Sequence, residues 1–286
     1  MPVAPDNKAP RRNDGAITLG AGGSVYVVDS DRAQVSLEYD LYQSLHFQLD
    51  SYDLRSNRVL ANGGWALLPE LWLGTQVGFE HYAFGGPAYS REPFVTPFVS
   101  YTQGNWGLTQ LLYRHGNSTY LQQPFEGIRN GPTDVVTLSQ TFYWGARYAT
   151  VGYEFGSERP NDSQGSDNAS CLARAATTGE LCPGDYRFHY NQAYVGIGFT
   201  PGWRTSFDVM YLFRHENYTQ VNTQPLGSGG MGKRRDDINQ VQVGVRRPIG
   251  RYFTVGLNYF GTFDSSNIDF YTYDRHIVAA EVRFAY

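Results

Sequence analysis

The chain has 286 residues, of which 41% are apolar, 17% charged and 15% aromatic, and its formal net charge at pH 7 is −4. Ordinary globular domains carry about 25% charged residues, so this chain is poor in charge and rich in aromatic side chains. The negative net charge argues against nucleic acid as a partner, because duplex binders need a basic surface. No run of about 18 apolar residues is present, which excludes a transmembrane helix.

The N-terminal segment, residues 1–14, is polar and rich in proline (MPVAPDNKAPRRND). It lacks the apolar stretch of a secretory signal peptide, so we interpret it as a flexible lead-in. No later change in composition marks a domain boundary. We therefore expect a single domain over residues 15–286.

Alternation of apolar and polar residues is the dominant pattern of that domain. It is clearest in the segments Val35–Leu41, Leu71–Glu80, Val241–Arg246 and Val278–Tyr286. Successive side chains of a strand point to opposite faces of a sheet, so each segment has one apolar face and one polar or small face. Helices would need apolar residues three and four positions apart, which these segments lack.

Turn signals divide the chain into short and long connections that alternate. Short turns are expected at Asp29–Arg32, Leu68–Glu70, Gln103–Asn105, Gly145–Arg147, Thr200–Gly202 and Ile249–Arg251. Longer polar stretches lie between them, at Gln48–Ser51, Gly85–Ser90, Gly116–Thr133, Ser157–Asp185, Glu216–Arg235 and Asp264–Thr272. This layout is typical of outer-membrane barrels. It predicts an all-β fold, a transmembrane up-and-down antiparallel β-barrel.

The strand number follows from counting and parity. The segments amount to roughly thirteen strands, whereas bacterial single-chain barrels have an even number. Either one further strand lies upstream or two strands are merged in this count. We expect about fourteen strands, within a range of about 12 to 16.

The tryptophans all lie within a few residues of the short turns: Trp65, Trp72, Trp106, Trp144 and Trp203. Indole rings favour the membrane–water interface, where barrels gather aromatic residues into girdles. The alternative is that large aromatic residues are common near the turns of any β-protein. We predict an aromatic girdle on the side of the short turns.

Ionisable residues fall on the polar face of the expected strands. With the apolar face toward lipid, the residues predicted to line the lumen are Glu38, Asp40, Glu80, Arg114, Glu154, Arg204, Asp208, Arg214, Arg246, Glu281 and Arg283. A charge facing lipid at mid-membrane costs about 2–4 kcal/mol, which supports this orientation. Both signs are present, so the two interpretations are ion pairs across the lumen and a pore of mixed polarity.

The two cysteines, Cys171 and Cys182, lie in the longest predicted loop. A pair this close in an exported loop predicts a disulfide. A metal pair is the alternative, but no nearby histidine or third cysteine completes a site, and no histidines have ligand spacing. We expect neither a metal nor a cofactor.

Catalytic signals are absent. The sequence has no Gly-x-Ser-x-Gly elbow, and the glycine-rich stretch 227–233 (GSGGMGK) fits no phosphate-binding loop. The segments Leu112–Asn117 and Leu212–Asn217 share an Arg-His pair. These pairs either line the outer mouth or repeat a strand-exit signal, and we favour the second. We expect no enzyme activity and no catalytic residues.

Several short motifs carry a family resemblance. They include Tyr42–His46, Arg246–Ile249, Ser266–Phe270 and Tyr273–Arg275. The chain resembles the porin-like β-barrel at the C-terminus of tetratricopeptide-repeat outer-membrane proteins, a group that includes the surface lipoprotein assembly modifiers. Two departures are the absence of a helical repeat region here and the missing first strand. The terminal pattern Val282-x-Phe284-x-Tyr286 is similar to the signal that recruits the barrel-assembly machinery, with Glu281 where a glycine often stands.

The sequence thus predicts a barrel of the bacterial outer membrane that serves as a conduit or export domain for a macromolecule, either protein or polysaccharide. The alternatives are a general diffusion porin for small solutes and a structural barrel with a plugged lumen. The expected partners are outer-membrane lipid and the barrel-assembly machinery. A periplasmic helical-repeat region and an exported substrate are further candidates implied by the resemblance.

Overall fold

The computed structural model describes residues 16–48, 50–123, 125–161, 168–178, 181–201, 204–224, 227 and 229–284. The lead-in 1–14 lies outside these residues. The strands are β1 (Ala16–Asp29), β2 (Ala33–His46), β3 (Leu54–Leu68), β4 (Leu71–Phe84), β5 (Ala88–Gln103), β6 (Gly107–Tyr120), β7 (Gly131–Trp144), β8 (Arg147–Glu158), β9 (Phe188–Phe199), β10 (Ser206–Val221), β11 (Lys233–Ile249), β12 (Phe253–Ser266) and β13 (Tyr273–Phe284). The helical elements are η1 (Asp50–Tyr52), α1 (Asn168–Thr178), η2 (Pro183–Tyr186) and η3 (Asp269–Tyr271). Within the described ranges, every helix is too short and too polar to cross a membrane.

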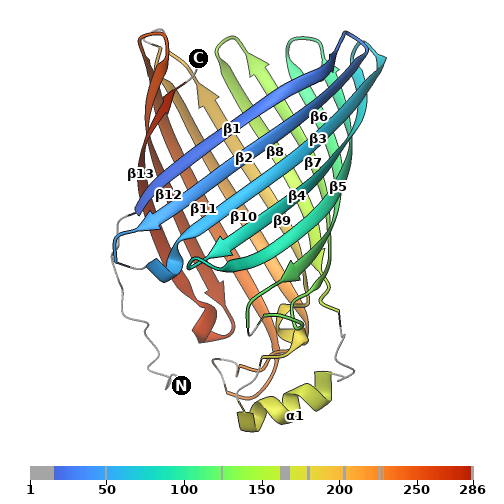
Figure 1. Ribbon diagram of the computed structural model, residues 1–286, viewed down its shortest axis with the longest axis vertical. Helices are drawn as coiled ribbons and strands as arrows, with labels where there is room; N and C mark the ends of the chain where they lie inside the picture. The colour runs from blue at the N-terminus through green and yellow to red at the C-terminus, as the bar shows by residue number, and fades with distance from the viewer. Residues whose placement is uncertain are drawn as a thin grey trace.

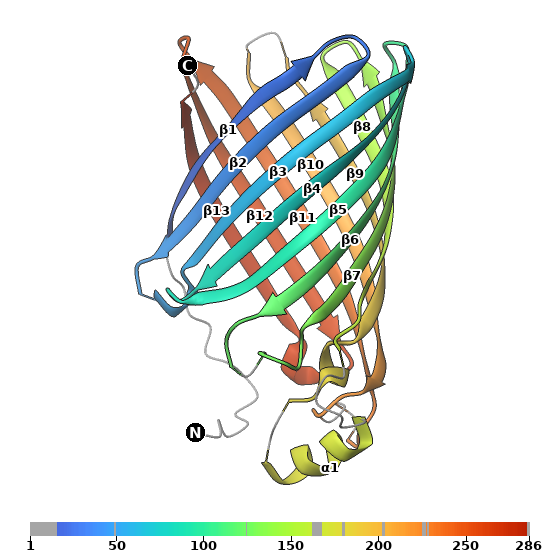
Figure 2. The same cartoon turned by 45° about the vertical axis from the view of Figure 1, so that its right-hand side comes forward.

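All thirteen strands belong to one sheet, in which each strand pairs antiparallel with its neighbours in the sequence. The prediction of an all-β, up-and-down antiparallel fold is confirmed. The sheet curls round on itself, which brings the two edge strands, β1 and β13, to the same side of the molecule (Figures 1 and 2). Over the described residues these two strands are not paired with each other. The strand count is therefore thirteen along an open sheet, inside the predicted range.

The connections alternate in length much as the turn signals indicated. Short turns join the strands at one end, whereas α1, η2 and η3 all lie at the other end (Figure 1). One expected long loop is short, because β4 ends at Phe84 and β5 begins at Ala88. Positive φ angles at Gly85 and Gly86 make this tight turn. The polar residues after Gly86 belong to a strand.

The two faces of the sheet follow from the register. Glu38 pairs with Leu60, and Leu60 pairs with Gly78, so the three share the interior surface of the curled sheet, which we call the lumen face. Leu60 is 5% exposed, whereas the adjacent Val59, on the outer face, is 50% exposed. Exposed apolar side chains such as Val59 thus lie on the outer face, whereas ionisable groups such as Glu38 lie on the lumen face beside buried apolar side chains such as Leu60.

Glycines on the lumen face lie beneath aromatic rings of the neighbouring strand. A Cβ atom added to Gly74 would lie 2.2 Å from Phe98 Cζ and 2.6 Å from the backbone oxygen of Gly63. Gly152 stands in the same relation to the ring of Tyr194, at 2.1 Å. The absence of a side chain at these positions lets the rings lie flat along the wall.

The longest connection, between β8 and β9, contains α1 and η2. It is stabilised by a disulfide within the connection and by hydrogen bonds to the segment after β10. Cys171 and Cys182 form a disulfide with a Cα–Cα distance of 5.9 Å and a sequence separation of 11. Asp185, which is 1% exposed, accepts hydrogen bonds from the backbone N and Oγ1 of Thr223 at 2.7 and 2.8 Å and from the backbone N of Cys182. These contacts join η2 to the end of β10.

The substitution Gly74→Ala should destabilise the fold. Its Cβ would overlap a backbone oxygen, and overpacking of this kind costs about 1–3 kcal/mol. Gly63→Ala is the matched control, because a Cβ there meets nothing within 4 Å. Thermal unfolding in detergent, followed by circular dichroism, should give a lower Tm for Gly74→Ala alone. Equal Tm values for the two variants would contradict this packing.

Replacing both Cys171 and Cys182 by serine should loosen the β8–β9 connection. Closing a loop of this length contributes about 3 kcal/mol in the chain-entropy model, and the effect is local because no strand pairing depends on it. Limited proteolysis should cleave the variant within residues 159–187 much faster than the parent chain. The Tm of the sheet should stay the same, and a fall in Tm as large as that of Gly74→Ala would show that the bridge supports the strands as well.

Candidate functional site

Ionisable side chains of several strands lie on the lumen face. On the paired strands the lumen-facing members of the predicted set are Glu38, Asp40, Glu80, Arg114, Glu154, Asp208, Arg214, Arg246, Glu281 and Arg283. The ion pairs that they form join neighbouring or next-neighbouring strands of the sheet.

The prediction for Arg204 is wrong. β9 ends at Phe199 and β10 begins at Ser206, so Arg204 lies in the connection between them and is exposed. Its φ is 60°, and its backbone N donates to the Pro201 oxygen at 3.1 Å. The turn is longer than the predicted Thr200–Gly202, which removes Arg204 from the alternating part of the chain.

Arg58, on β3, binds two carboxylates of β2. Its Nη2 lies 2.6 Å from Asp40 Oδ2 and 3.5 Å from Glu38 Oε1, and its Nε donates to Asp40 at 3.1 Å. The three side chains remain partly open to solvent, with exposed fractions of 43% for Arg58 and 39% for Asp40. The single positive charge of Arg58 therefore pairs with the negative charges of two carboxylates.

Arg114, on β6, repeats this arrangement. Its Nη2 lies 3.1 Å from Glu80 Oε2 and 2.8 Å from Glu92 Oε1. The guanidinium also stacks over the ring of Phe94, with Cζ 3.7 Å from the centroid. The carboxylates come from β4 and β5, so Arg114 joins three consecutive strands.

Arg246, on β11, binds carboxylates from both directions. Its Nη1 lies 2.6 Å from Asp208 Oδ1 on β10, and its Nε lies 2.7 Å from Glu281 Oε1 on β13. Here the charges balance, because Arg283 also pairs with Glu281, at 3.1 Å. Asn258 accepts a further hydrogen bond from Arg246 at 3.3 Å.

Glu154 differs from the other lumen carboxylates, because its hydrogen-bond donors are neutral. Tyr190 Oη donates to it at 2.6 Å and Thr137 Oγ1 at 3.1 Å. Arg214 stacks on the Tyr190 ring at 3.6 Å and pairs with Glu216 at 2.7 Å. The negative charge of Glu154 therefore has no arginine bound to it in the described part of the chain.

Toward the long loops the interior is more tightly packed. Arg234 pairs with Asp236 at 2.5 Å and stacks over Tyr271, with Cζ 3.4 Å from the ring centroid. Asp264 is also buried there. Five of the ionisable residues found on this face were not among the predicted ones: Arg58, Glu92, Arg234, Asp236 and Asp264. Extending the alternation of β3, β5, β11 and β12 to the strand ends would have found them.

The loop after β6 contacts the connection after β8 through a basic and aromatic cluster. Arg129 pairs with Glu158 at 3.3 Å and lies over the rings of Tyr120 and Tyr186, at 4.8 and 5.2 Å. Phe125 packs edge-on against Tyr186 at 5.9 Å. Burial raises the pKa of the Tyr186 phenol, so this side chain stays neutral at physiological pH.

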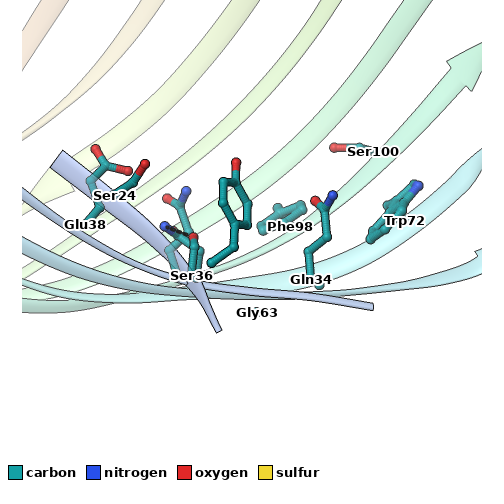
Figure 3. A pocket seen from close by; sticks show the side chains of 12 residues that line it. Ser24, Gln34, Ser36, Glu38, Gly63, Trp72, Phe98 and Ser100 are labelled. Atoms are coloured by element: carbon teal, nitrogen blue, oxygen red, sulfur yellow. Dashed lines mark hydrogen bonds between the residues drawn. The ribbon is translucent and has the colours of Figure 1, made fainter. Parts of the chain in front are cut away.

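The opposite end of the lumen contains a recess of about 340 Å³ (Figure 3). Its wall is made by β1 to β5 and consists of serines, side-chain amides and aromatic rings. The lining residues are Ser24, Tyr26, Gln34, Ser36, Glu38, Asn62, Gly63, Gly64, Trp72, Gln76, Phe98 and Ser100. Glu38 is the charged residue among them, so a solute in this recess meets a neutral polar surface and one carboxylate.

The tryptophans are distributed over both faces. Trp65, Trp106 and Trp144 are exposed near the short turns, as a girdle requires. Trp72 contradicts the prediction, because it shares the face of Gln76 and lines the recess (Figure 3). Alternation from Leu71 already places Trp72 on the polar face of its strand. Trp203 lies outside the described residues.

The repeated Arg-His pairs divide between the faces. Arg114 and Arg214 point to the lumen face, and the histidines that follow them point outward. His115 Nδ1 lies 2.8 Å from Asp134 Oδ1, and the corresponding distance from His215 to Asp237 is 2.6 Å. The pairs therefore lie at equivalent positions of two strands.

Outward tyrosines form a second set of cross-strand contacts. Each hydroxyl lies within hydrogen-bond distance of a polar side chain on the next strand: Tyr39 to Asn57, Tyr113 to Asp134, Tyr153 to Asn191, Tyr211 to Asn239 and Tyr259 to His276. Several of these tyrosines lie near the middle of their strands, as Tyr39 does in β2 and Tyr259 in β12. They provide hydrogen-bond partners for polar groups of the outer face.

The described residues contain no group of three His, Cys, Asp or Glu side chains that could hold a metal ion. The arrangement is a water-accessible wall of fixed charges and hydrogen-bonding groups. It can hold ions and polar solutes close to its surface.

The substitution Arg114→Gln should destabilise the fold, because it leaves Glu80 and Glu92, which are 14% and 18% exposed, facing each other without a cation. The expected loss is about 1–3 kcal/mol in the free energy of unfolding. Chemical denaturation in detergent measures it, with Arg91→Gln on the outer face as control. Adding Glu92→Gln to Arg114→Gln should restore part of the loss, and no difference between Arg114→Gln and the control would contradict the interaction.

Comparison with known proteins yields no family model and no curated sequence that match the chain. Two solved structures of similar fold are both OmpT, an outer membrane protein of Vibrio cholerae. The in-vitro folded form has a TM-score of 0.47 and 8% identity, with coverage of 96% of this chain and 98% of that chain. For the outer-membrane expressed form the TM-score is 0.45 and the identity 8%, with coverage of 96% and 97%. These values support no assignment of activity, and the resemblance to barrels of tetratricopeptide-repeat proteins stays a prediction.

Proposed function

We propose that the chain forms a pore in the bacterial outer membrane that lets small hydrophilic solutes pass. The observation that carries this proposal is the division of the sheet into an apolar outer face and a charged, hydrogen-bonding interior. Only a surrounding of lipid outside and water inside makes both faces favourable.

The outer face supports the membrane location. Each strand from β1 to β12 contributes an exposed apolar side chain to it, among them Leu19, Leu37, Val59, Val77, Val99, Leu111, Leu138, Val151, Ile197, Val209, Val243 and Leu257. A water-soluble monomer rarely exposes an apolar patch larger than a few hundred Å². In lipid the same side chains are in a favourable environment.

The strands are also long enough to cross a membrane. The strands contain 12 to 17 residues, and about 9–11 residues suffice for a tilted strand to cross the hydrocarbon core. The remaining residues extend beyond it on the side of the long loops. By analogy with known barrels, the short turns then face the periplasm and the long connections face outward.

A pore needs a closed wall, so closure of the sheet belongs to this proposal. In an alternating meander β1 and β13 run in the same direction. Their unpaired backbone groups would cost several kcal/mol each in lipid. Pairing of the two edges in parallel would close the wall, and so would one further strand antiparallel to both. The second route gives the even count of about fourteen that bacterial barrels favour.

The interior favours small solutes over a macromolecule. Toward the long loops it is narrowed by packed aromatic and arginine side chains, among them Arg234, Tyr218 and Tyr271. An export role, a helical-repeat partner, recruitment of the assembly machinery and the absence of catalysis all stay predictions.

Permeability of reconstituted protein tests the proposal. Liposomes containing the chain should swell in solutions of small sugars and amino acids, and the rate should fall steeply with solute size, because the lumen is narrow. Planar bilayers should show stepwise current increments. Liposomes with heat-denatured protein are the control. A monodisperse, detergent-free soluble monomer, or folded protein in bilayers that passes neither solute nor current, would contradict the proposal.

A further inference from the structure

The lumen face is not electrically uniform around its circumference. On the side formed by β2 to β8, Arg58 and Arg114 each bind two carboxylates, and Glu154 binds neutral donors. On the side formed by β10 to β13, the arginines Arg214, Arg234, Arg246, Arg275 and Arg283 accompany the carboxylates Asp208, Glu216, Asp236, Asp264 and Glu281. Positive and negative groups are therefore matched on the second side and unmatched on the first.

Two carboxylates on the unmatched side are open to solvent. Glu38 and Asp40 are roughly one-third exposed, and Glu38 borders the recess of neutral amides and serines. Two carboxylates that share one guanidinium retain a net negative charge, which pairing with a single arginine does not cancel. A narrow aqueous space beside such a wall attracts cations and repels anions over about a Debye length, ~10 Å at 0.1 M salt.

We propose that the pore prefers cations to anions of similar size, and that the β2–β8 side of the lumen sets this preference. The proposal rests on the proposed function, since it describes the same passage. Small inorganic cations and solutes with an ammonium group are the favoured class. Anionic solutes are excluded from the recess because Glu38 is its charged group and no arginine lines it.

The test is the reversal potential of the full chain in a planar bilayer with a KCl gradient. We expect the sign that corresponds to K⁺ passing more readily than Cl⁻. The preference should weaken when the mean KCl concentration rises from 0.1 M to 1 M, because the Debye length falls to about 3 Å. Both measurements use the unmodified protein, so they do not depend on the folding of a variant.

Variants then locate the effect. Glu154→Gln and Glu38→Gln are close in shape to the parent and should each shift the permeability ratio toward one. Arg58→Gln should shift it further toward cations. Asp237→Asn, on the outer face, is the control and should leave the ratio unchanged.

The outcomes separate the two proposals. Currents with no ion preference, or with a preference for Cl⁻, would overturn this inference and leave the pore in place. A cation preference that Glu154→Gln and Glu38→Gln do not reduce would overturn the assignment to the β2–β8 side. Absence of any current in folded, inserted protein would overturn the proposed function and this inference with it.

Discussion

The fold depends on one constraint, the fixed register of an antiparallel hydrogen-bonded sheet. A slip of one residue between two strands exchanges the faces of every side chain in the slipped strand. For β6 that would turn Arg114 toward the apolar side and Tyr113 toward the interior. In a membrane the misplaced charge alone would cost about 2–4 kcal/mol. The ion pairs of the lumen and the apolar outer face thus specify the same register, and each supports the other.

The lumen is shaped by side chains that do not carry charge. Where Tyr194 crosses Gly152, the ring lies directly against the backbone of the neighbouring strand. Phe94 gives the Arg114 guanidinium a flat surface, which holds it between Glu80 and Glu92. The geometry of the charged groups is therefore set by neighbouring glycine and aromatic residues. A comparison of charges alone would miss this dependence.

Much of this architecture could be predicted from alternation, because a period of two is a local property. The segments around Val35–Leu41 and Val241–Arg246 lie in β2 and β11 as expected. The partners of each charge could not be predicted, since they depend on register between strands, and for this reason the contacts of Arg114 with Glu80 and Glu92 could not be foreseen. The predicted positions of Trp72 in the girdle and of Arg204 in the lumen were wrong for a different reason. Proximity to a turn does not decide the face of a residue, and the length of a turn decides whether alternation applies at all.

Each of the thirteen strands pairs only with its neighbours in the sequence, which makes it simple for related sheets to differ in strand number and diameter. Each hairpin contacts only the strands before and after it in the chain, so the loss or duplication of a hairpin leaves the remaining pairs intact. The circumference changes by two strands, and the diameter changes nearly in proportion. The width of the interior is then a modular quantity that gene rearrangement can alter in steps. The repeated Arg-His segments of β6 and β10, with Arg inward and His outward in both, are what a duplicated unit would leave behind.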